Sequence, residues 1–257
     1  MRLGFDLDGT VADMQSALAR EARRLFPDVN PASLPKSAAP DASAGARGAG
    51  GVALSAPAAN GAESPQSTST GGLTQKQQSE LWKAVCAQVN WWEGLAEIEE
   101  GALARLFAMV QERKWELIFL TSRPETRGDT AQLQSYRWLM SKGYESPSVF
   151  VVHGSRGKIA AALNLDVLVD DRPENCLDVA IDSQARPILV WRGDEAKVPA
   201  SARQLGIGSV ASIEECLDIL TRLDEPDSVG ASLVDRLKRL FGLKPSAQKR
   251  GQTRTAV

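Results

Sequence analysis

Near the N-terminus the chain reads Leu3-Gly4-Phe5-Asp6-Leu7-Asp8-Gly9-Thr10, an apolar run that ends in two aspartates and a glycine. Apolar residues at successive positions are typical of a strand that is covered on both faces. In an extended chain Asp6 and Asp8 point to the same side, and Gly9 permits a tight turn away from the strand. The stretch therefore predicts a buried strand that brings two carboxylates to one end of a sheet.

Similar apolar runs recur along the chain and alternate with segments of helical periodicity. The expected strands are residues 3–6, 117–121, 149–152, 167–169 and 188–191, and the expected helices are 102–113, 130–142, 158–163, 175–182 and 212–223. Alternation of this kind predicts an α/β fold, a Rossmann-like three-layer arrangement with a parallel sheet between two layers of helices. Ligands of such sheets bind beyond the carboxyl ends of the strands, so those ends are where functional residues are expected.

The composition excludes several classes of protein. The 257 residues are 43% hydrophobic and 24% charged with a net charge of -2, which gives no general attraction to nucleic acid or to an anionic membrane. The three cysteines lack CxxC spacing, and the single histidine, His153, rules out a multi-histidine metal site. No run suits a signal peptide or an integral membrane segment, so we expect a cytoplasmic protein.

Two further predicted strands also end in polar residues. Thr121 and Ser122 follow the run at 117–121, and Asp170 and Asp171 follow the run at 167–169. The carboxyl ends of parallel strands lie at one edge of the sheet, so these hydroxyls and carboxylates are expected near Asp6. Oxygen ligands of this kind suit Mg²⁺ together with a phosphate group.

Taken together, these motifs resemble the haloacid dehalogenase (HAD) superfamily of phosphohydrolases. Residues 6–10 match its first motif, DxDG[TV], Thr121 matches the second, and residues 167–171 match the fourth, an apolar strand ending in paired acids. The third motif is a lysine or arginine. Arg156 fits its usual position better and Lys158 keeps its usual residue type, so both remain candidates.

The resemblance implies a mechanism. Asp6 is the nucleophile that forms an aspartyl-phosphate, and Asp8 is the general acid and base. Mg²⁺ is held by Asp6, the backbone carbonyl of Asp8 and Asp170, while Asp171 orients these ligands. The phosphate-binding residues are Thr121, Ser122 and either Arg156 or Lys158.

The resemblance also implies a helical cap inserted after the first strand, which gives three segments. Residues 1–13 and 115–225 form the HAD catalytic core, residues 14–114 form the cap, and residues 226–257 form a tail. Within the cap, residues 31–72 are rich in Ala, Gly, Ser and Pro and are predicted to be disordered. Three tryptophans (Trp82, Trp91 and Trp92) either pack the core of the cap or stack on a nucleobase.

Resemblances to two branches of the superfamily imply different substrates. Residues 6–13 and 170–176 resemble the 5'(3')-deoxyribonucleotidases, although Thr10 stands where that branch usually has Val. Residues 121–124, 136–139 and 170–173 resemble the polynucleotide kinase phosphatase domain, which removes 3'-phosphates from nucleic-acid ends. Candidate phosphate contacts for either substrate are Arg123, Arg127, Arg137 and Arg172.

Both branches imply hydrolysis of a phosphomonoester, in a nucleotide or other small phosphorylated metabolite or at a nucleic-acid end. A phosphomutase shares the aspartyl-phosphate chemistry. A non-catalytic HAD-fold binding protein is a further alternative, against which intact Asp6, Asp8 and Asp170 argue. The tail carries apolar residues at helical spacing among basic ones, a pattern that suits docking on a partner, on a membrane surface or on the chain's own domain.

Overall fold

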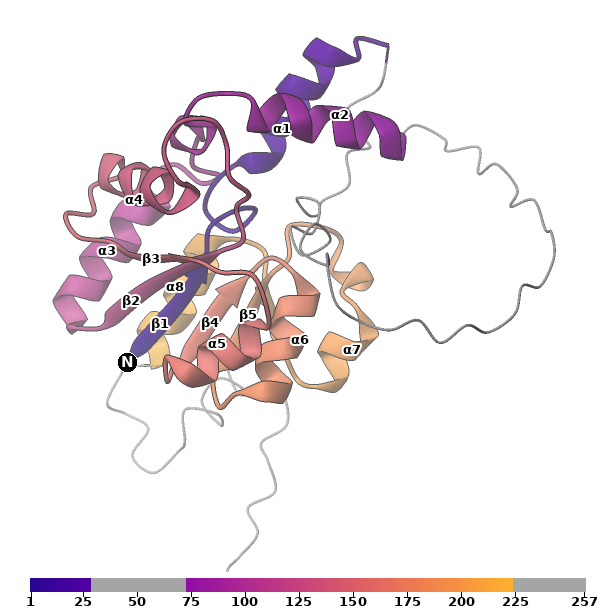
Figure 1. Cartoon of the computed structure of the whole chain (residues 1–257). Helices are drawn as coiled ribbons and strands as arrows, with labels where there is room; N and C mark the ends of the chain where they lie inside the picture. The colour runs from indigo at the N-terminus through magenta and orange to yellow at the C-terminus, as the bar shows by residue number, and fades with distance from the viewer. Residues whose placement is uncertain (29–72, 224–257) are drawn as a thin grey trace, which may run out of the picture. The chain divides into compact units, whose positions relative to one another are not determined.

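The structure is a computed structural model that describes residues 1–28 and 73–223 (Figure 1). The predicted disordered segment at 31–72 and the predicted basic tail at 226–257 lie outside these residues, so both stay predictions. No helix within the described ranges is long and apolar enough to cross a membrane.

A six-stranded parallel sheet confirms the predicted α/β fold class. Its strands are β1 (Arg2–Asp6), β2 (Glu116–Thr121), β3 (Ser148–Val151), β4 (Val167–Asp170), β5 (Arg186–Val190) and β6 (Gly208–Val210). The strand order is β3-β2-β1-β4-β5-β6, and β1, β4, β5 and β6 pair in parallel. This is the order of the doubly wound Rossmann-like fold, whose topological switch point lies beside the first strand. The sequence did not predict β6, because three residues are too few to show a pattern.

The helices follow the predicted periodicity closely. They are α1 (Met14–Leu25), α2 (Gln75–Cys86), α3 (Ala102–Arg113), α4 (Ala131–Ser141), α5 (Arg156–Ala162), α6 (Pro173–Asp182), α7 (Ala200–Gln204) and α8 (Ile213–Leu223), with short 3-10 helices η3 (Trp91–Gly94) and η4 (Glu195–Lys197). Side-chain caps begin several of them. Thr74, for example, accepts from the N–H of Gln77 while the Gln77 side chain accepts from the N–H of Thr74, a capping box.

The described residues divide into two compact units. The first contains residues 1–11, 97–119 and 154–223, and the second contains 12–28, 73–96 and 120–153, so the two units share β2. These boundaries differ from the predicted ones, since α3 falls in the first unit, and residues 120–153 fall in the second. The predicted division into core, cap and tail stays a prediction.

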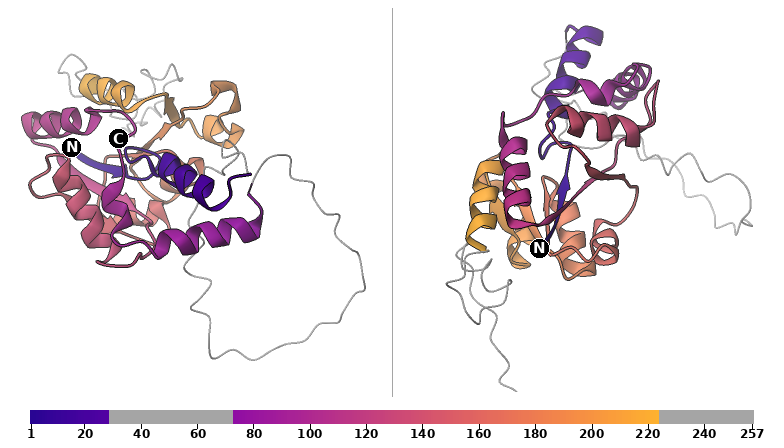
Figure 2. Two further views of the ribbon diagram at one scale, coloured as in Figure 1. Left: turned by 90° about the horizontal axis from the view of Figure 1, so that it is seen from above. Right: turned by 90° about the vertical axis from the view of Figure 1, so that its left-hand side faces the viewer.

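The first unit is built around β1, β4, β5 and β6. Helices α5 and α6 cover one face of these strands, α3 and α8 cover the other, and α7 packs against α6 (Figure 2). The strand residues between the two helical layers are buried, including Leu3, Phe5, Leu168 and Leu189. Burial on both faces explains why these strands are continuous apolar runs rather than alternating ones.

The second unit has its own apolar cluster between α1 and α2. Ala22, Leu73, Leu81 and Val85 form its buried part, and partly buried residues that include Trp82 and Trp91 pack against it. Trp92 is 1% exposed and its indole N–H donates to the Pro124 carbonyl, 2.9 Å away. Trp92 therefore packs the interior of this unit, the first of the two alternatives, whereas Trp82 and Trp91 are only partly buried.

Two of the arginines proposed as phosphate contacts have other roles in the second unit. Arg123 is 1% exposed and its guanidinium lies 4.8 Å from the Trp92 ring centre and 5.7 Å from that of Trp138. Arg137 forms ion pairs with Asp129 and Glu93. Arg123 is thus part of the unit's packing, a result of cation–π attraction that sequence position does not reveal.

Helices α5 and α6 approach one another closely at Gly157. A Cβ placed on Gly157 would lie 2.2 Å from the carbonyl oxygen of Asp178 and 2.7 Å from the Cβ of Asp182. Only a residue without a side chain allows this contact, in which the Gly157 N–H donates to the Asp178 carboxylate at 3.0 Å.

We expect Gly157→Ala to lower the free energy of unfolding by about 1–3 kcal/mol, because backbone atoms of α6 cannot move aside without shifting the helix. Urea unfolding followed by circular dichroism measures the change. The matched control is Gly94→Ala, where no atom lies within 4 Å of the new Cβ and the effect should stay below about 0.5 kcal/mol. Equal stability of the two variants would contradict the close contact.

Candidate active site

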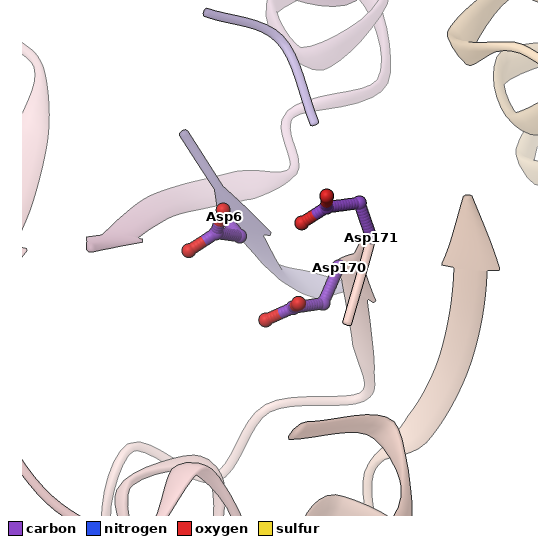
Figure 3. A group of neighbouring side chains, drawn as sticks. All are labelled: Asp6, Asp170 and Asp171. Atoms are coloured by element: carbon purple, nitrogen blue, oxygen red, sulfur yellow. The ribbon is translucent and has the colours of Figure 1, made fainter. Parts of the chain in front are cut away.

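The carboxyl ends of β1 and β4 place three aspartates together. In the parallel pairing Phe5 lies opposite Val169, so Asp6 and Asp170 end neighbouring strands, and Asp171 follows directly. One carboxylate oxygen from each lies within 4.8 Å of the other two. Figure 3 shows the three side chains near one another at the strand ends.

Burial makes this cluster electrostatically costly. Asp6 is 6% exposed and Asp170 is fully buried. Burial, followed by the charge of Asp170, raises the pKa of Asp6 well above its ordinary value. Burial and the same Asp170 charge raise the pKa of Asp171 to about 7, while Arg172 and Arg192 act in the opposite direction. A cation between the carboxylates would remove most of this repulsion.

Asp170 is held in place by the start of α6. Its Oδ1 accepts from the Arg172 backbone N–H at 2.8 Å, and its Oδ2 accepts from the Asn175 side-chain amide, also at 2.8 Å. Pro173 begins the helix, where a missing N–H costs nothing. Burial raises the pKa of Asp170, and the Arg156 charge and these hydrogen bonds oppose that rise. The β4–α6 turn thus fixes the orientation of this carboxylate.

Asp171 lies against the loop that follows β1. Its Oδ1 is buried without a hydrogen-bond partner among the described residues. Gly9 has φ of +89°, and a Cβ there would lie 2.3 Å from Asp171 Oδ2. The loop backbone therefore comes so close that only glycine fits. The structure places this carboxylate among the clustered three, and its predicted role of orienting the metal ligands stays a prediction.

These residues fit a hard divalent cation. All three donors are carboxylate oxygens, the type preferred by Mg²⁺, and the unsatisfied Asp171 Oδ1 is a buried acceptor without a donor. Asp8 lies in the turn closed by the Val11 N–H and the Leu7 carbonyl at 2.9 Å. Its side chain is half-buried, and the predicted contact of its backbone carbonyl with the metal stays a prediction.

Arg156 lies at this cluster and Lys158 does not. The Arg156 side chain is 3% exposed, with Nη2 3.2 Å from Asp6 Oδ1 and Nε 3.9 Å from Asp170 Oδ2. Lys158 is exposed on the first turn of α5, where its N–H donates to the capping hydroxyl of Ser155. Both residues are in the same helical turn, but only the Arg156 side chain points toward the aspartates.

Thr121 and Ser122 belong to the second unit, so their predicted contact with phosphate stays a prediction. Thr121 is 1% exposed, and its carbonyl accepts from the Val152 N–H at 2.8 Å. The Ser122 hydroxyl is 3.1 Å from the Val152 carbonyl. Both residues are therefore hydrogen-bonded to the segment that follows β3.

No local sequence signal pointed to Arg192, which follows β5. Its guanidinium donates to the carbonyls of Gly9 and Thr10, in the loop next to Asp8. An arginine just beyond a strand is commonly a surface residue, and nothing in the neighbouring sequence marks a contact across 183 positions.

Comparisons with known proteins give similarities of fold only. No protein-family model matches the sequence, and no curated protein matches it significantly. A solved structure of a candidate beta-phosphoglucomutase from Thermotoga maritima aligns with 17% identity and a TM-score of 0.48, covering 86% of this chain and 99% of that one. A hydrolase from Pseudomonas syringae aligns with 14% identity and a TM-score of 0.43, covering 88% and 99%. At these levels of similarity neither structure indicates which reaction this protein carries out.

Removing one carboxylate should stabilise the protein when no metal is present. We expect Asp171→Asn to raise the free energy of unfolding by about 1 kcal/mol in EDTA, because it removes a buried charge beside two others. Mg²⁺ should then raise the melting temperature less than it does for the unchanged protein.

Thermal unfolding with EDTA and with Mg²⁺, at a pH well above the pKa of Asp171, measures both effects. Asp218→Asn is the control, since that carboxylate is exposed and pairs with Arg105. An Asp171→Asn protein that is less stable in EDTA, or that keeps the full response to Mg²⁺, would contradict the cation site.

Proposed function

We propose that the protein is a Mg²⁺-dependent phosphomonoester hydrolase of the HAD superfamily that acts through an aspartyl-phosphate on Asp6. The observation that carries the proposal is the convergence of Asp6, Asp170 and Asp171 with the buried Arg156 at the carboxyl ends of β1 and β4. Acids that bind a cation and a guanidinium that binds an anion are what a phosphate monoester requires. The resemblance of the motifs supports the same reaction.

Two displacements at phosphorus complete the reaction. An Asp6 carboxylate oxygen attacks phosphorus and the bond to the leaving oxygen breaks, while Asp8 gives that oxygen a proton. Asp8, now ionised, takes a proton from water, whose oxygen attacks the aspartyl-phosphate. The bond between phosphorus and Asp6 breaks, which releases inorganic phosphate and regenerates both carboxyl groups.

In this proposal the residues that would hold Mg²⁺ are those at the ends of β1 and β4. Asp6, the backbone carbonyl of Asp8 and Asp170 would hold Mg²⁺, and Asp171 either orients them or supplies a further oxygen. When bound, Mg²⁺ reduces the repulsion between the Asp6 carboxylate and the phosphate and stabilises charge in the transition state.

Arg156 binds the phosphoryl oxygens in this proposal. It is buried beside the nucleophile, and a guanidinium presents two parallel N–H donors to an anion. In the structure the same donors face Asp6 and Asp170, so an incoming phosphate replaces part of an existing interaction. Thr121 and Ser122 are proposed as additional ligands of the phosphoryl group.

The proposed substrate is a nucleotide or another small phosphorylated metabolite, and a 3'-phosphorylated nucleic-acid end is the alternative. The burial of Trp92 removes one candidate for stacking on a base. A panel of nucleoside monophosphates, sugar phosphates and 3'-phosphorylated oligonucleotides distinguishes the two classes.

Phosphate release from this panel tests the reaction. We expect release with Mg²⁺, none with EDTA, and a loss of at least about 10³-fold in kcat for Asp6→Asn, because the amide oxygen is a poor nucleophile. Asp218→Asn should release phosphate at the unchanged rate.

Three other results of this assay would contradict the proposal. Transfer of the phosphoryl group to a sugar hydroxyl instead of water would identify a phosphomutase. Activity retained by Asp6→Asn would refute the aspartyl-phosphate. No release from any member of the panel would refute the hydrolase as proposed and favour a binding protein.

A second comparison separates Arg156 from Lys158. We expect Arg156→Ala to lower kcat/KM by about 10²- to 10³-fold, since it removes the buried donor to the phosphoryl oxygens. Arg156→Lys should recover part of the loss, because the charge remains and the paired donors do not. Lys158→Ala is the matched control on the same turn of α5 and should change kcat/KM less than about twofold. The reverse order of effects in steady-state kinetics would assign the third motif to Lys158.

A further inference from the structure

Arg192 donates hydrogen bonds to the backbone of the loop that carries Asp8. Its Nη1 donates to the Gly9 carbonyl at 2.7 Å and its Nη2 donates to the Thr10 carbonyl at 2.9 Å. The two terminal nitrogens of one guanidinium thus bind two adjacent carbonyls. A fork of this kind fixes direction as well as distance, because both donors lie in one plane.

Glu99 also binds this guanidinium. Its Oε1 lies 2.6 Å from Arg192 Nη2, and the pair is only partly exposed, at 26% for Arg192 and 21% for Glu99. The same carboxylate accepts from the N–H of Ile213 at 2.9 Å and from that of Glu214 at 3.2 Å, at the start of α8. A carboxylate at a helix N-terminus satisfies free N–H groups and interacts favourably with the helix dipole.

These contacts tie the loop to two rigid parts of the first unit. Arg192 is two residues beyond β5, and Glu99 is bound to the first turn of α8, which packs on β5 and β6. Burial opposes ionisation of Glu99, but the hydrogen bonds from Arg192, Ile213 and Glu214 together lower its pKa. Glu99 therefore stays ionised at neutral pH.

Leu7, Thr10 and Val11 anchor the loop in the interior, and Asp8 and Gly9 between them are half-buried. Gly9 adopts φ of +89°, a conformation that glycine enters and leaves easily. The loop's backbone hydrogen bonds join Val11 N–H to the Leu7 carbonyl at 2.9 Å and Ile98 N–H to the Val11 carbonyl at 3.0 Å. Asp8 lies inside this turn, so the direction of its side chain follows from the backbone that Arg192 holds.

We propose that Arg192, oriented by Glu99, is a positioning residue that holds the loop so that Asp8 reaches the leaving-group oxygen. This inference rests on the proposed function. Arg192 acts through the backbone next to the general acid, so its loss should impair proton transfer more than nucleophilic attack.

The dependence on the leaving group tests this role. p-Nitrophenyl phosphate releases a stable phenolate that needs little protonation, whereas an alkyl phosphate needs a proton from the general acid. For Arg192→Ala we expect kcat to fall about 10- to 100-fold on the best alkyl phosphate of the panel and less than about threefold on p-nitrophenyl phosphate, with KM nearly unchanged. Arg192→Lys should recover part of the loss, because one ammonium can still reach a carbonyl.

Arg203→Ala is the matched control. Its guanidinium also donates to backbone carbonyls, those of Glu195, Ala196 and Val198, but in the segment from η4 to α7. Its removal should cost similar stability and leave both kcat values unchanged. A double variant, Arg192→Ala with Asp8→Asn, should be no slower on the alkyl phosphate than Asp8→Asn alone, since both changes remove the same proton transfer.

The outcomes separate this inference from the proposed function. If the unchanged protein hydrolyses phosphomonoesters but Arg192→Ala loses activity equally on both substrates, or loses none, the inference is wrong and the hydrolase stands. If the unchanged protein is inactive on the whole panel, the proposed function fails and the inference falls with it. Should Arg192→Ala not fold, Arg192→Lys and Glu99→Gln carry the same leaving-group comparison.

Discussion

Two like charges are buried where β1 and β4 end, and the structure of the first unit depends on how they are compensated. Parallel pairing makes Asp6 and Asp170 neighbours, and the apolar strands below them exclude water. Two ionised carboxylates in such a place would repel strongly without compensation. Arg156 supplies a counter-charge to both, and the start of α6 donates two hydrogen bonds to Asp170. The cost is therefore offset by groups that are themselves fixed in position.

The packing of α5 and α6 brings this counter-charge to the aspartates. Arg156 can reach the aspartates only if α5 lies close to the strand ends, and Gly157 lets α5 approach α6 to the distance of a backbone contact. Gly9 has the same use in the loop after β1, where the backbone comes against the Asp171 carboxylate. Two glycines without side chains thus allow charged groups to gather in a small volume. Buried polar groups that are partly satisfied are typical of sites that await a ligand.

Local patterns were sufficient for most of the fold and part of the site. Apolar runs and helical periods give strong signals over five or more residues, which is why the strands at 3–6, 117–121 and 167–169 and most helices were predicted closely. The short strand β6 and helix α7 were not, since three to five residues carry no clear period. The gathering of Asp6 and Asp170 was also predictable, because parallel strands bring their carboxyl ends to one edge.

The sequence by itself determined the strand–helix alternation, the acids at the strand ends and, with one histidine, the exclusion of a multi-histidine metal site. The tertiary structure alone decided that Arg156 rather than Lys158 faces the aspartates, that Asp171 joins them, and that Trp92 is buried. It alone brought Arg192 to the loop beside Asp8. The reason is that periodicity reports which face of an element is apolar, whereas the contacts of a polar side chain depend on how elements distant in the sequence pack against one another.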